Sequence, residues 1–435
     1  MIRRVKIEGY KSLRAVEVEL KPLSIVFGPN AAGKSNLFDA LALLARMVTQ
    51  RNLREAFEQH RGAPLEAFFV GNGGIERLLQ ARTAEFRMEV DVELSQGVIS
   101  TVEKLIQEMR SGMPEEGEKA PPKQRIKHNY LRYALTVEIM TETGHLRVKD
   151  ESLRALNNDG TERLSRSAFV ERNEDHFSLR VEGQAHPSKH EIGLDHTLVS
   201  TPLYAPHYPH ITAFKEELLR WRFYYLEPRN LMRNDNPLQE VRSLDAEGSN
   251  LAAFYNSLKA SNPRQFANIN RTIPLLLPRV ERIDVERTPL GDLQLRVFES
   301  GIPFPARLVS EGTLRILGLL AITNALTPAA VVGYEEPENG VHPRRLELIA
   351  RLLKSAAEPT ETQFLINTHS SEFPEFFGKE AAFINCRKEG PCTTFEALTY
   401  DKMFFRSSVE EGLSEDDEPS VTTLGSRIRR GDYGG

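Results

Sequence analysis

The sequence predicts an α/β protein whose two chain ends build one head, with an antiparallel β lobe and a helical insertion between them. Three observations predict this class. A short apolar strand at 24–27 runs into a glycine-rich loop and then a helical pattern. Alternating strands joined by polar turns occupy much of 85–185. Short buried strands next to helical patterns return in the last third of the chain.

The N-terminal part of the head, residues 1–84, opens with two strand patterns. Val5 and Ile7 alternate with charged residues, and Val16 and Val18 do the same, which predicts two half-buried strands. The apolar run 24–27 predicts a third strand. Leucine and alanine residues at helical spacing after the glycine-rich loop predict a helix there.

The antiparallel β lobe is expected over residues 85–210. Apolar and polar residues alternate near 86–92, 135–139 and 177–181, as they do in strands with one buried face. Between two of these strands, the stretch 113–127 has few large apolar residues and is expected to be a flexible linker.

The helical insertion is expected over 211–275, and the C-terminal part of the head over 276–435. Apolar residues recur at helical intervals at the start of the insertion, at Phe214, Leu218, Leu219 and Phe223. In the C-terminal part, the uncharged stretch 316–332 predicts a buried helix followed by a buried strand. It contains polar residues and is slightly too short to cross a bilayer. An acidic tract at 410–418 is expected to be a solvated loop.

The composition is typical of a folded protein that works in a reducing compartment. Of the 435 residues, 40% are hydrophobic and 27% are charged, which excludes disorder as the overall state. The two cysteines, Cys386 and Cys392, are interpreted as free thiols. The N-terminus shows no apolar targeting segment, so we expect a cytoplasmic protein without membrane attachment.

Charge and histidine content give weaker indications. The formal net charge is −5, so DNA binding has to use a local basic patch such as 427–430. Six of the 11 histidines fall within 176–210. Only His186 and His190 have the i, i+4 spacing of zinc ligands on a helix, and Pro187 lies between them, so we interpret the histidines as solvated loop residues.

The glycine-rich loop, GPNAAGKS at 28–35, fits the spacing G-x-x-x-x-G-K-[ST]. In such a loop, backbone N–H groups and the N-terminus of the following helix surround the phosphates of a nucleotide. Lys34 is expected to reach the β and γ phosphates, and the Ser35 hydroxyl to bind Mg²⁺. The residues expected to contact nucleotide here are Gly28, Asn30, Gly33, Lys34, Ser35 and Asn36.

A second group of polar residues follows a buried strand near 329–334. Glu335 and Glu336 lie at its end, with Asn339 shortly after. One carboxylate beside a phosphate loop can hold Mg²⁺, and another can orient an attacking water. Such an acidic run is by itself typical of a charged loop, and the phosphate loop favours the functional interpretation.

Two further motifs lie on either side of this acidic strand end. Ser310 is a good N-cap for an apolar helix, whose free N–H groups, including that of Gly312, favour an anion. Another buried strand, at 364–367, ends in Thr-His-Ser, which places His369 at a strand end. A histidine there can contact a γ phosphate, although taken alone it is more typical of a structural residue.

The order of the four motifs resembles that of ABC-type ATPases of the SMC and RecF branch, and more closely that of bacterial AAA-type ATPases related to the OLD family. The resemblance covers both ends of the chain and extends to 221–224 and 248–252. It implies an ABC-type ATPase head with ATP and Mg²⁺ as ligands.

The same resemblance implies roles for individual residues. Lys34 and Ser35 would form the Walker A pair, Glu335 the magnesium residue, Glu336 the catalytic base and His369 the switch histidine. The division of roles between the two glutamates stays open. Lys11 and Ser12 would contact the nucleotide of their own chain. Ser310 and Gly312 would act in trans, on nucleotide held by a second copy. Asn339 would belong to the D-loop. Gln59 and Gln80 are the two candidates for the Q-loop glutamine.

The resemblance also implies a homodimer, or a higher oligomer of dimers, that closes on two ATP molecules. The first functional hypothesis is an ATPase that senses DNA or an invader and controls an effector such as a nuclease or toxin, as relatives in phage defence do. The chain after His369 is too short for a fused nuclease domain, so we expect a separately encoded effector.

Two alternatives belong to other functional classes. A RecF- or SMC-like DNA repair or clamp ATPase is the second hypothesis, although no sustained heptad pattern indicates an SMC-type coiled coil. The nucleotide-binding subunit of a transporter is a remote third. It is disfavoured because Lys34 and Ser310 lie at opposite ends of this chain rather than in one short domain.

Overall fold

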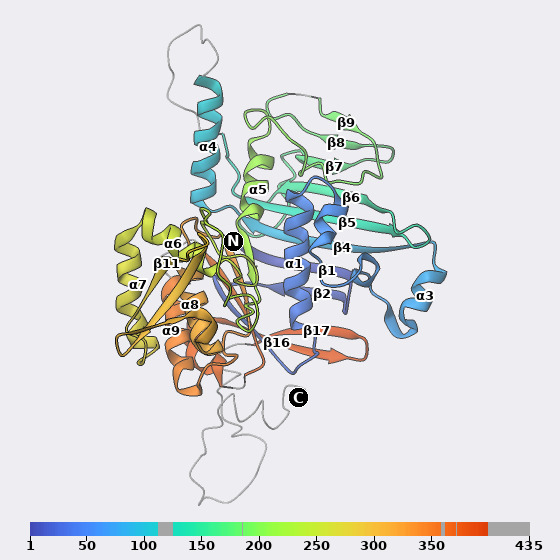
Figure 1. Cartoon of the computed structure of the whole chain (residues 1–435). Helices are drawn as coiled ribbons and strands as arrows, with labels where there is room; N and C mark the ends of the chain where they lie inside the picture. Colours follow the sequence, from blue (N-terminus) through green and yellow to red (C-terminus); the bar gives the residue numbers. More distant parts are fainter. Residues whose placement is uncertain (112–124, 185, 358–361, 371, 399–435) are drawn as a thin grey trace, which may run out of the picture.

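The computed structural model describes residues 1–111, 125–184, 186–357, 362–370 and 372–398. This part of the chain builds three β-sheets with helices packed between and around them (Figure 1). The expected linker at 113–127 lies mostly outside the described residues, and the acidic tract 410–418 and the basic segment 427–430 lie wholly outside them.

The largest sheet is antiparallel and has the strand order β2-β1-β4-β5-β6-β7-β8-β9. Its strands are β1 (Ile2–Tyr10), β2 (Leu13–Glu19), β4 (Thr83–Glu93), β5 (Tyr130–Met140), β6 (Leu146–Ala155), β7 (Val170–Arg172), β8 (Phe177–Leu179) and β9 (Ser188–His190). The predicted N-terminal strands are confirmed, with Val5 and Ile7 buried on one face of β1. Because β1 pairs with β4, this sheet crosses the boundary expected between 1–84 and 85–210.

The second sheet has the order β10-β14-β15-β3-β16-β17 and is parallel except for its last strand. Its strands are β3 (Leu23–Phe27), β10 (Trp221–Tyr224), β14 (Val331–Glu335), β15 (Gln363–Thr368), β16 (Ala382–Glu389) and β17 (Cys392–Leu398). The parallel strands end at one edge, which is where ligands bind in open α/β sheets. The phosphate loop, the acidic run and the Thr-His-Ser segment all follow strands at this edge.

A third, three-stranded sheet and most of the helices complete the fold. The sheet contains β11 (Arg282–Arg287), β12 (Leu293–Glu299) and β13 (Ile302–Pro305). The α-helices are α1 (Lys34–Thr49), α2 (Leu53–Glu58), α3 (Gly74–Gln80), α4 (Gln96–Ser111), α5 (Pro209–Leu219), α6 (Leu251–Ser261), α7 (Pro263–Leu276), α8 (Glu311–Thr323) and α9 (Leu346–Ala357). Short 3₁₀ helices lie at Pro64–Ala67, Gly71–Gly73, Ala306–Leu308, Pro343–Arg345 and Phe373–Glu380.

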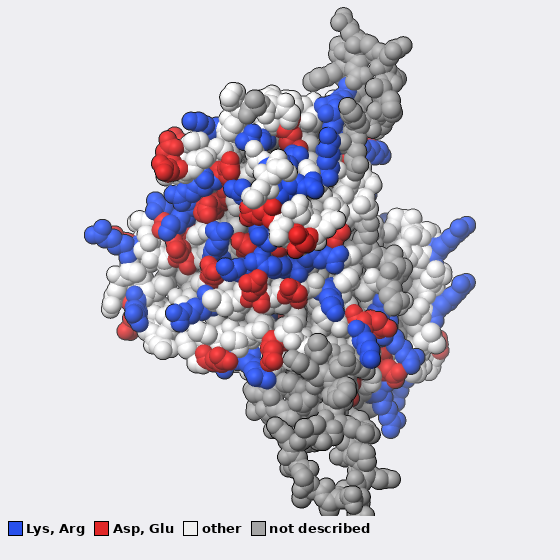
Figure 2. Space-filling model, turned by 180° about the vertical axis from the view of Figure 1, so that it is seen from behind, with Lys and Arg blue, Asp and Glu red and all other residues white. Residues whose placement is uncertain are grey.

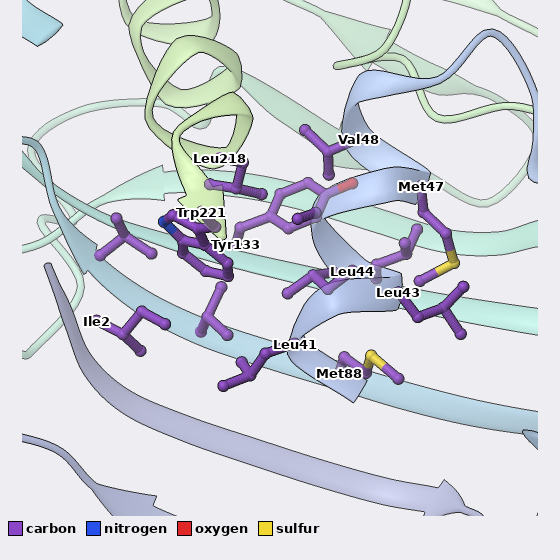
Figure 3. Packing of buried hydrophobic residues seen from close by; sticks show 14 of the residues in the cluster. Ile2, Leu41, Leu43, Leu44, Met47, Val48, Met88, Tyr133, Leu218 and Trp221 are labelled. Atoms are coloured by element: carbon purple, nitrogen blue, oxygen red, sulfur yellow. The ribbon is translucent and has the colours of Figure 1, made fainter. Parts of the chain in front are cut away.

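Helix α1 lies between the two large sheets and joins their cores. Its Leu41 and Leu44 are buried in one cluster with Met88 of β4, Tyr133 of β5 and Trp221 of β10 (Figure 3). The helix is rich in leucine and alanine and contains neither glycine nor proline, so its sequence favours an uninterrupted helix. A helix fixed in this way holds the phosphate loop, which precedes it, against both sheets.

The expected helical insertion contains a strand that the sequence pattern did not indicate. Helices α5, α6 and α7 are present, but Phe223, which fitted the helical spacing, lies in β10. The segment Trp-Arg-Phe-Tyr is rich in aromatic residues, which favour strands. The ring of Phe223 packs on Gly333 of β14, where an added Cβ would lie 2.3 Å from that ring. Tertiary packing therefore decides the structure of this segment.

The buried helix and strand expected across 316–332 are confirmed as α8 and β14. No helix within the described ranges is long and apolar enough to cross a membrane. Nor do the described histidine, cysteine and acidic residues include a group of three that could hold a metal ion. Cys386 and Cys392 are both free thiols, on either side of the turn between β16 and β17.

The outer face of the large antiparallel sheet carries positive and negative side chains next to one another (Figure 2). Arg4 lies 2.7 Å from Glu89, and Arg132 lies 2.6 Å from Asp91. Since these arginines have acidic neighbours, much of the positive charge on this face is balanced locally.

Candidate nucleotide-binding site

The phosphate loop joins β3 to α1, and its two motif glycines have conformations and neighbours that exclude a side chain. Gly28 has φ 151° and Gly33 has φ 103°. A Cβ on Gly28 would lie 2.2 Å from the Cys386 carbonyl oxygen, and one on Gly33 would lie 2.1 Å from Thr393 Oγ1. Neighbouring strands β16 and β17 therefore require glycine at both positions. Asn30 lies exposed at the loop.

Lys34 is folded into the curve of this loop. Its Nζ donates hydrogen bonds to the carbonyl oxygens of Gly28, at 2.8 Å, and Pro29, at 2.9 Å. Burial lowers the pKa of Lys34, although the nearby carboxylates oppose this. The loop thus encloses a cationic side chain at its centre, in the position from which a P-loop lysine reaches nucleotide phosphates.

The end of β14 lies directly against the start of α1. Ser35 Oγ donates a hydrogen bond to Glu335 Oε2 over 2.6 Å. Asn367 Nδ2, at the end of β15, is 3.3 Å from each of these two oxygens. Burial raises the pKa of Glu335, while Arg61 and Ser35 oppose this rise. Residues from three neighbouring strand ends therefore meet at one point.

Arg61 is a member of this site that the sequence analysis missed. Its Nη2 is 3.0 Å from Glu335 Oε1 and its Nε is 3.5 Å from Asp39 Oδ1. The guanidinium also lies 5.1 Å from the centre of the Tyr225 ring. No sequence motif marks this arginine. It lies two residues after Gln59, one of the two glutamines considered for the Q-loop, and no hydrogen bond in the described structure links Gln59 or Gln80 to these residues.

The turn between β1 and β2 closes the other side of the phosphate loop. Lys11 Nζ is 2.8 Å from Asp39 Oδ2 of α1. Ser12 Oγ accepts a hydrogen bond from Asn36 Nδ2 at 2.7 Å and lies 2.6 Å from Thr393 Oγ1. Lys11, Ser12 and Asn36 thus lie beside the loop, as the resemblance implies.

Glu336 follows β14 in an unusual backbone conformation, with φ 48°. Its N–H donates to the Asn367 carbonyl oxygen at 2.9 Å, which holds the turn against β15. Its carboxylate accepts a hydrogen bond from Asn339 Nδ2, and its Oε1 is 3.4 Å from His369 Nδ1. A strained residue at a strand end is typical of functional sites. The structure brings together the expected base, the D-loop asparagine and the switch histidine.

Ser310 and Gly312 lie apart from the phosphate loop of their own chain. Ser310 Oγ caps α8 by accepting from Thr313 N at 3.2 Å. A Cβ on Gly312 would lie 2.2 Å from the Gly340 carbonyl oxygen, so the start of α8 packs on the loop that follows Asn339. Within the described part of the chain, neither residue forms a hydrogen bond with residues 28–36. The close approach of the Gly340 carbonyl oxygen within the same chain is thus one reason why residue 312 is glycine.

The oxygen atoms at the end of β14 fit a magnesium ion. A hydroxyl, on Ser35, and a carboxylate, on Glu335, are adjacent, and Mg²⁺ prefers oxygen ligands of these kinds together with phosphate oxygens. The carboxylate is 6% exposed and already faces a positive group, Arg61. The Glu335 carboxylate therefore already has a cationic partner.

Comparison with protein families gives a match over most of the chain. Residues 23–107 and 113–373 match the family described as "AAA domain, putative AbiEii toxin, Type IV TA system". The chain belongs to this family. The matched segments include the phosphate loop, the acidic strand end and the Thr-His-Ser segment. A comparison with curated proteins finds no match.

Solved structures similar to this family member are SMC head domains. The SMC head crystallised with the C-terminal winged-helix domain of ScpA has a TM-score of 0.55 at 12% identity, covering 92% of this chain and 99% of that one. The Thermotoga maritima SMC head gives 0.40 at 14% identity, covering 91% and 98%. A Pyrococcus furiosus SMC head gives 0.47 at 12%, covering 92% and 97%. The first of these shows that the chain has an ABC-type ATPase head fold.

Proposed function

We propose that this chain binds and hydrolyses ATP with Mg²⁺ and acts as a dimeric switch. The observation that carries the proposal is the 2.6 Å hydrogen bond from Ser35 to Glu335, because it joins the phosphate loop to the acidic strand end. Glu336 and His369 lie next to this junction. A phosphate cradle, two carboxylates and a histidine at adjacent strand ends are the parts that phosphoryl transfer to water needs.

Each residue has a role that follows from its place. Lys34 and the backbone N–H groups of the loop bind the phosphates. Glu336 accepts a proton from the attacking water, or orients it, and His369 contacts the γ phosphate. Ser35 and Glu335 would hold Mg²⁺, which neutralises charge on the phosphate oxygens. The hydrogen bond from Asn339 orients the Glu336 carboxylate.

The switch depends on a second copy of the chain. Ser310 is exposed and Gly312 is partly buried at the start of α8, and neither forms a described hydrogen bond with the phosphate loop of its own chain, which leaves this helix start to contact a nucleotide held by another copy. A γ phosphate contacted from both sides stabilises the closed dimer only while ATP is intact, so hydrolysis favours opening. We infer a homodimer, or an oligomer of dimers.

The biological output we propose is control of a separately encoded effector, such as a nuclease or toxin, in response to DNA or an invader. The family description, which names a toxin–antitoxin system, supports this output. A RecF- or SMC-like role in DNA repair or clamping is the second candidate, and the similarity in fold to an SMC head favours it.

The test is steady-state ATPase activity with and without duplex DNA, using Glu336→Gln as the inactive control. We expect a rate well above that of the control. Stimulation by DNA would support a DNA sensor or repair role, and an unchanged rate would support a protein trigger. A wild-type rate no higher than that of Glu336→Gln would refute hydrolysis.

The dimer is tested separately by size-exclusion chromatography. Glu336→Gln with ATP and Mg²⁺ should elute as a dimer, because ATP persists, and without nucleotide it should elute later, as a monomer. A monomer under both conditions would contradict the proposed switch.

A further inference from the structure

The third carboxylate of the acidic run, Glu338, has contacts that the proposed roles of Glu335 and Glu336 do not explain. It is only 8% exposed. Its Oε1 accepts a hydrogen bond from Thr368 Oγ1 at 2.5 Å, from the His369 N–H at 3.2 Å and from the Ser370 N–H at 3.3 Å. One oxygen atom therefore accepts from three consecutive residues, the last residue of β15 and the two that follow it.

These contacts connect two loops that would otherwise be independent. Glu338 belongs to the loop after β14, and its donors are the last residue of β15 and the first two residues of the loop that follows. Hydrogen bonds to a carboxylate are shorter and stronger than those between neutral groups. The loop after β15 is also tied to itself, because Ser370 N donates to Thr368 Oγ1 at 3.0 Å. The backbone of His369 is thus fixed on the acidic loop.

The His369 ring extends from this fixed backbone toward the expected base. Its Nδ1 lies 3.4 Å from Glu336 Oε1 and 3.6 Å from Glu338 Oε1. The ring is 38% exposed, whereas the Glu338 side chain is 7% exposed. A buried anchor therefore holds an accessible imidazole. The second oxygen of Glu338, Oε2, is buried with no hydrogen-bond partner among the described residues.

We propose that Glu338 is a positioning residue for ATP hydrolysis, which holds the loop after β15 so that His369 faces Glu336 and the γ phosphate. The inference rests on the proposed ATPase function. Glu338 does not contact the reacting atoms in this role and acts through His369. Its hydrogen bonds with the N–H groups of His369 and Ser370 fix the backbone from which the imidazole extends.

The test compares Glu338→Ala and Glu338→Gln in steady-state ATPase assays. Glu338→Ala removes the acceptor, so kcat should fall about ten-fold while KM changes less than about two-fold. Glu338→Gln keeps a carbonyl oxygen that accepts the same donors, so its kcat should stay within about three-fold of wild type. Glu347→Gln, at an exposed position on α9, is the matched control and should match wild type. An unchanged kcat in Glu338→Ala would overturn the proposal.

A double-mutant cycle separates positioning from general stabilisation. If Glu338 acts through His369, adding Glu338→Ala to His369→Ala should change kcat by less than about two-fold. A further loss of about ten-fold would mean that the two residues act independently, which would overturn the proposal. Thr368→Val removes one donor at nearly constant volume and should lower kcat in the same direction. It provides the same test if Glu338→Ala fails to fold.

Amide hydrogen exchange gives a readout that does not depend on ATPase activity. The amides of His369 and Ser370 should exchange faster in Glu338→Ala than in wild type, while that of Leu365 in β15 should not change. Equal exchange at His369 and Ser370 would show that Glu338 does not hold the loop. If wild type hydrolyses no more ATP than Glu336→Gln, the proposed function and the positioning role fail together, and faster exchange would then assign Glu338 a structural role alone.

Discussion

Replacing Gly312 with alanine should destabilise the protein even without nucleotide. The new Cβ would lie 2.2 Å from the Gly340 carbonyl oxygen, whereas ordinary contacts begin near 3.4 Å, so the start of α8 and the loop after Asn339 must separate by about 1 Å. Overpacking of this kind costs about 1–3 kcal/mol. Alanine recovers up to about 1 kcal/mol through its higher helix propensity. We therefore expect a net loss of about 1–2 kcal/mol.

Urea denaturation of the nucleotide-free protein measures this loss directly. Glu108→Ala on α4 is the control, because it introduces alanine on a helix at a side chain that is 64% exposed. Its free energy of unfolding should change by less than about 0.5 kcal/mol. If Gly312→Ala denatures like wild type but loses ATP-dependent dimerisation, the intrachain explanation is wrong and Gly312 acts only on the second copy.

Three other predictions follow from buried charges. Lys34→Ala should abolish ATP binding, measured by equilibrium dialysis with Mg²⁺, because it removes the cation at the centre of the phosphate loop; retained binding would contradict that role. Arg61→Ala should lower the free energy of unfolding by about 1 kcal/mol, a small value because the guanidinium is half exposed to solvent. Arg61→Lys should lower it less. Equal urea midpoints for wild type and Arg61→Ala would refute this prediction. Burial raises the pKa of Glu151 to about 7 from 4.5, so its contribution to stability is complete below pH 4.5 and is lost as the pH rises through about 7. The loss amounts to up to about 3 kcal/mol, and Glu151→Gln should remove it; an unchanged pH profile of urea midpoints in that variant would contradict the assignment.

The parts of the site that could be predicted from sequence are those marked by neighbouring residues. The glycine spacing before Lys34 and Ser35 is typical of a phosphate loop and of few other structures. Glu335 comes at the end of a run of apolar residues that predicts a strand. The alternation at Val5 and Ile7 predicted β1 because only one face of that strand is buried. In each case, the chemistry and its local structure lie within one short segment.

Contacts between distant segments could not be predicted in this way. Arg61 bonds to Glu335 across 274 positions, and no local pattern distinguishes it from an ordinary surface arginine. In the sequence, Glu338 is one more charged residue of an acidic loop, and nothing near it indicates that its hydrogen-bond donors lie about 30 residues later. Phe223 fitted a helical period but lies in β10, where Gly333 leaves space for its ring. These features depend on which strands become neighbours.

The position of β3 in the parallel sheet sets the order in which the protein can be made. Leu23 of β3 pairs with Phe364 of β15, and Ser24 pairs with Ala382 of β16, so both partners are synthesised more than 300 residues later. At about 5–20 residues per second, translation takes on the order of tens of seconds to reach them. The antiparallel sheet and α1 can form earlier from nearby segments. A nascent chain therefore displays its phosphate loop long before Glu335 exists, and the contact between Ser35 and Glu335 forms only after β14 has been synthesised.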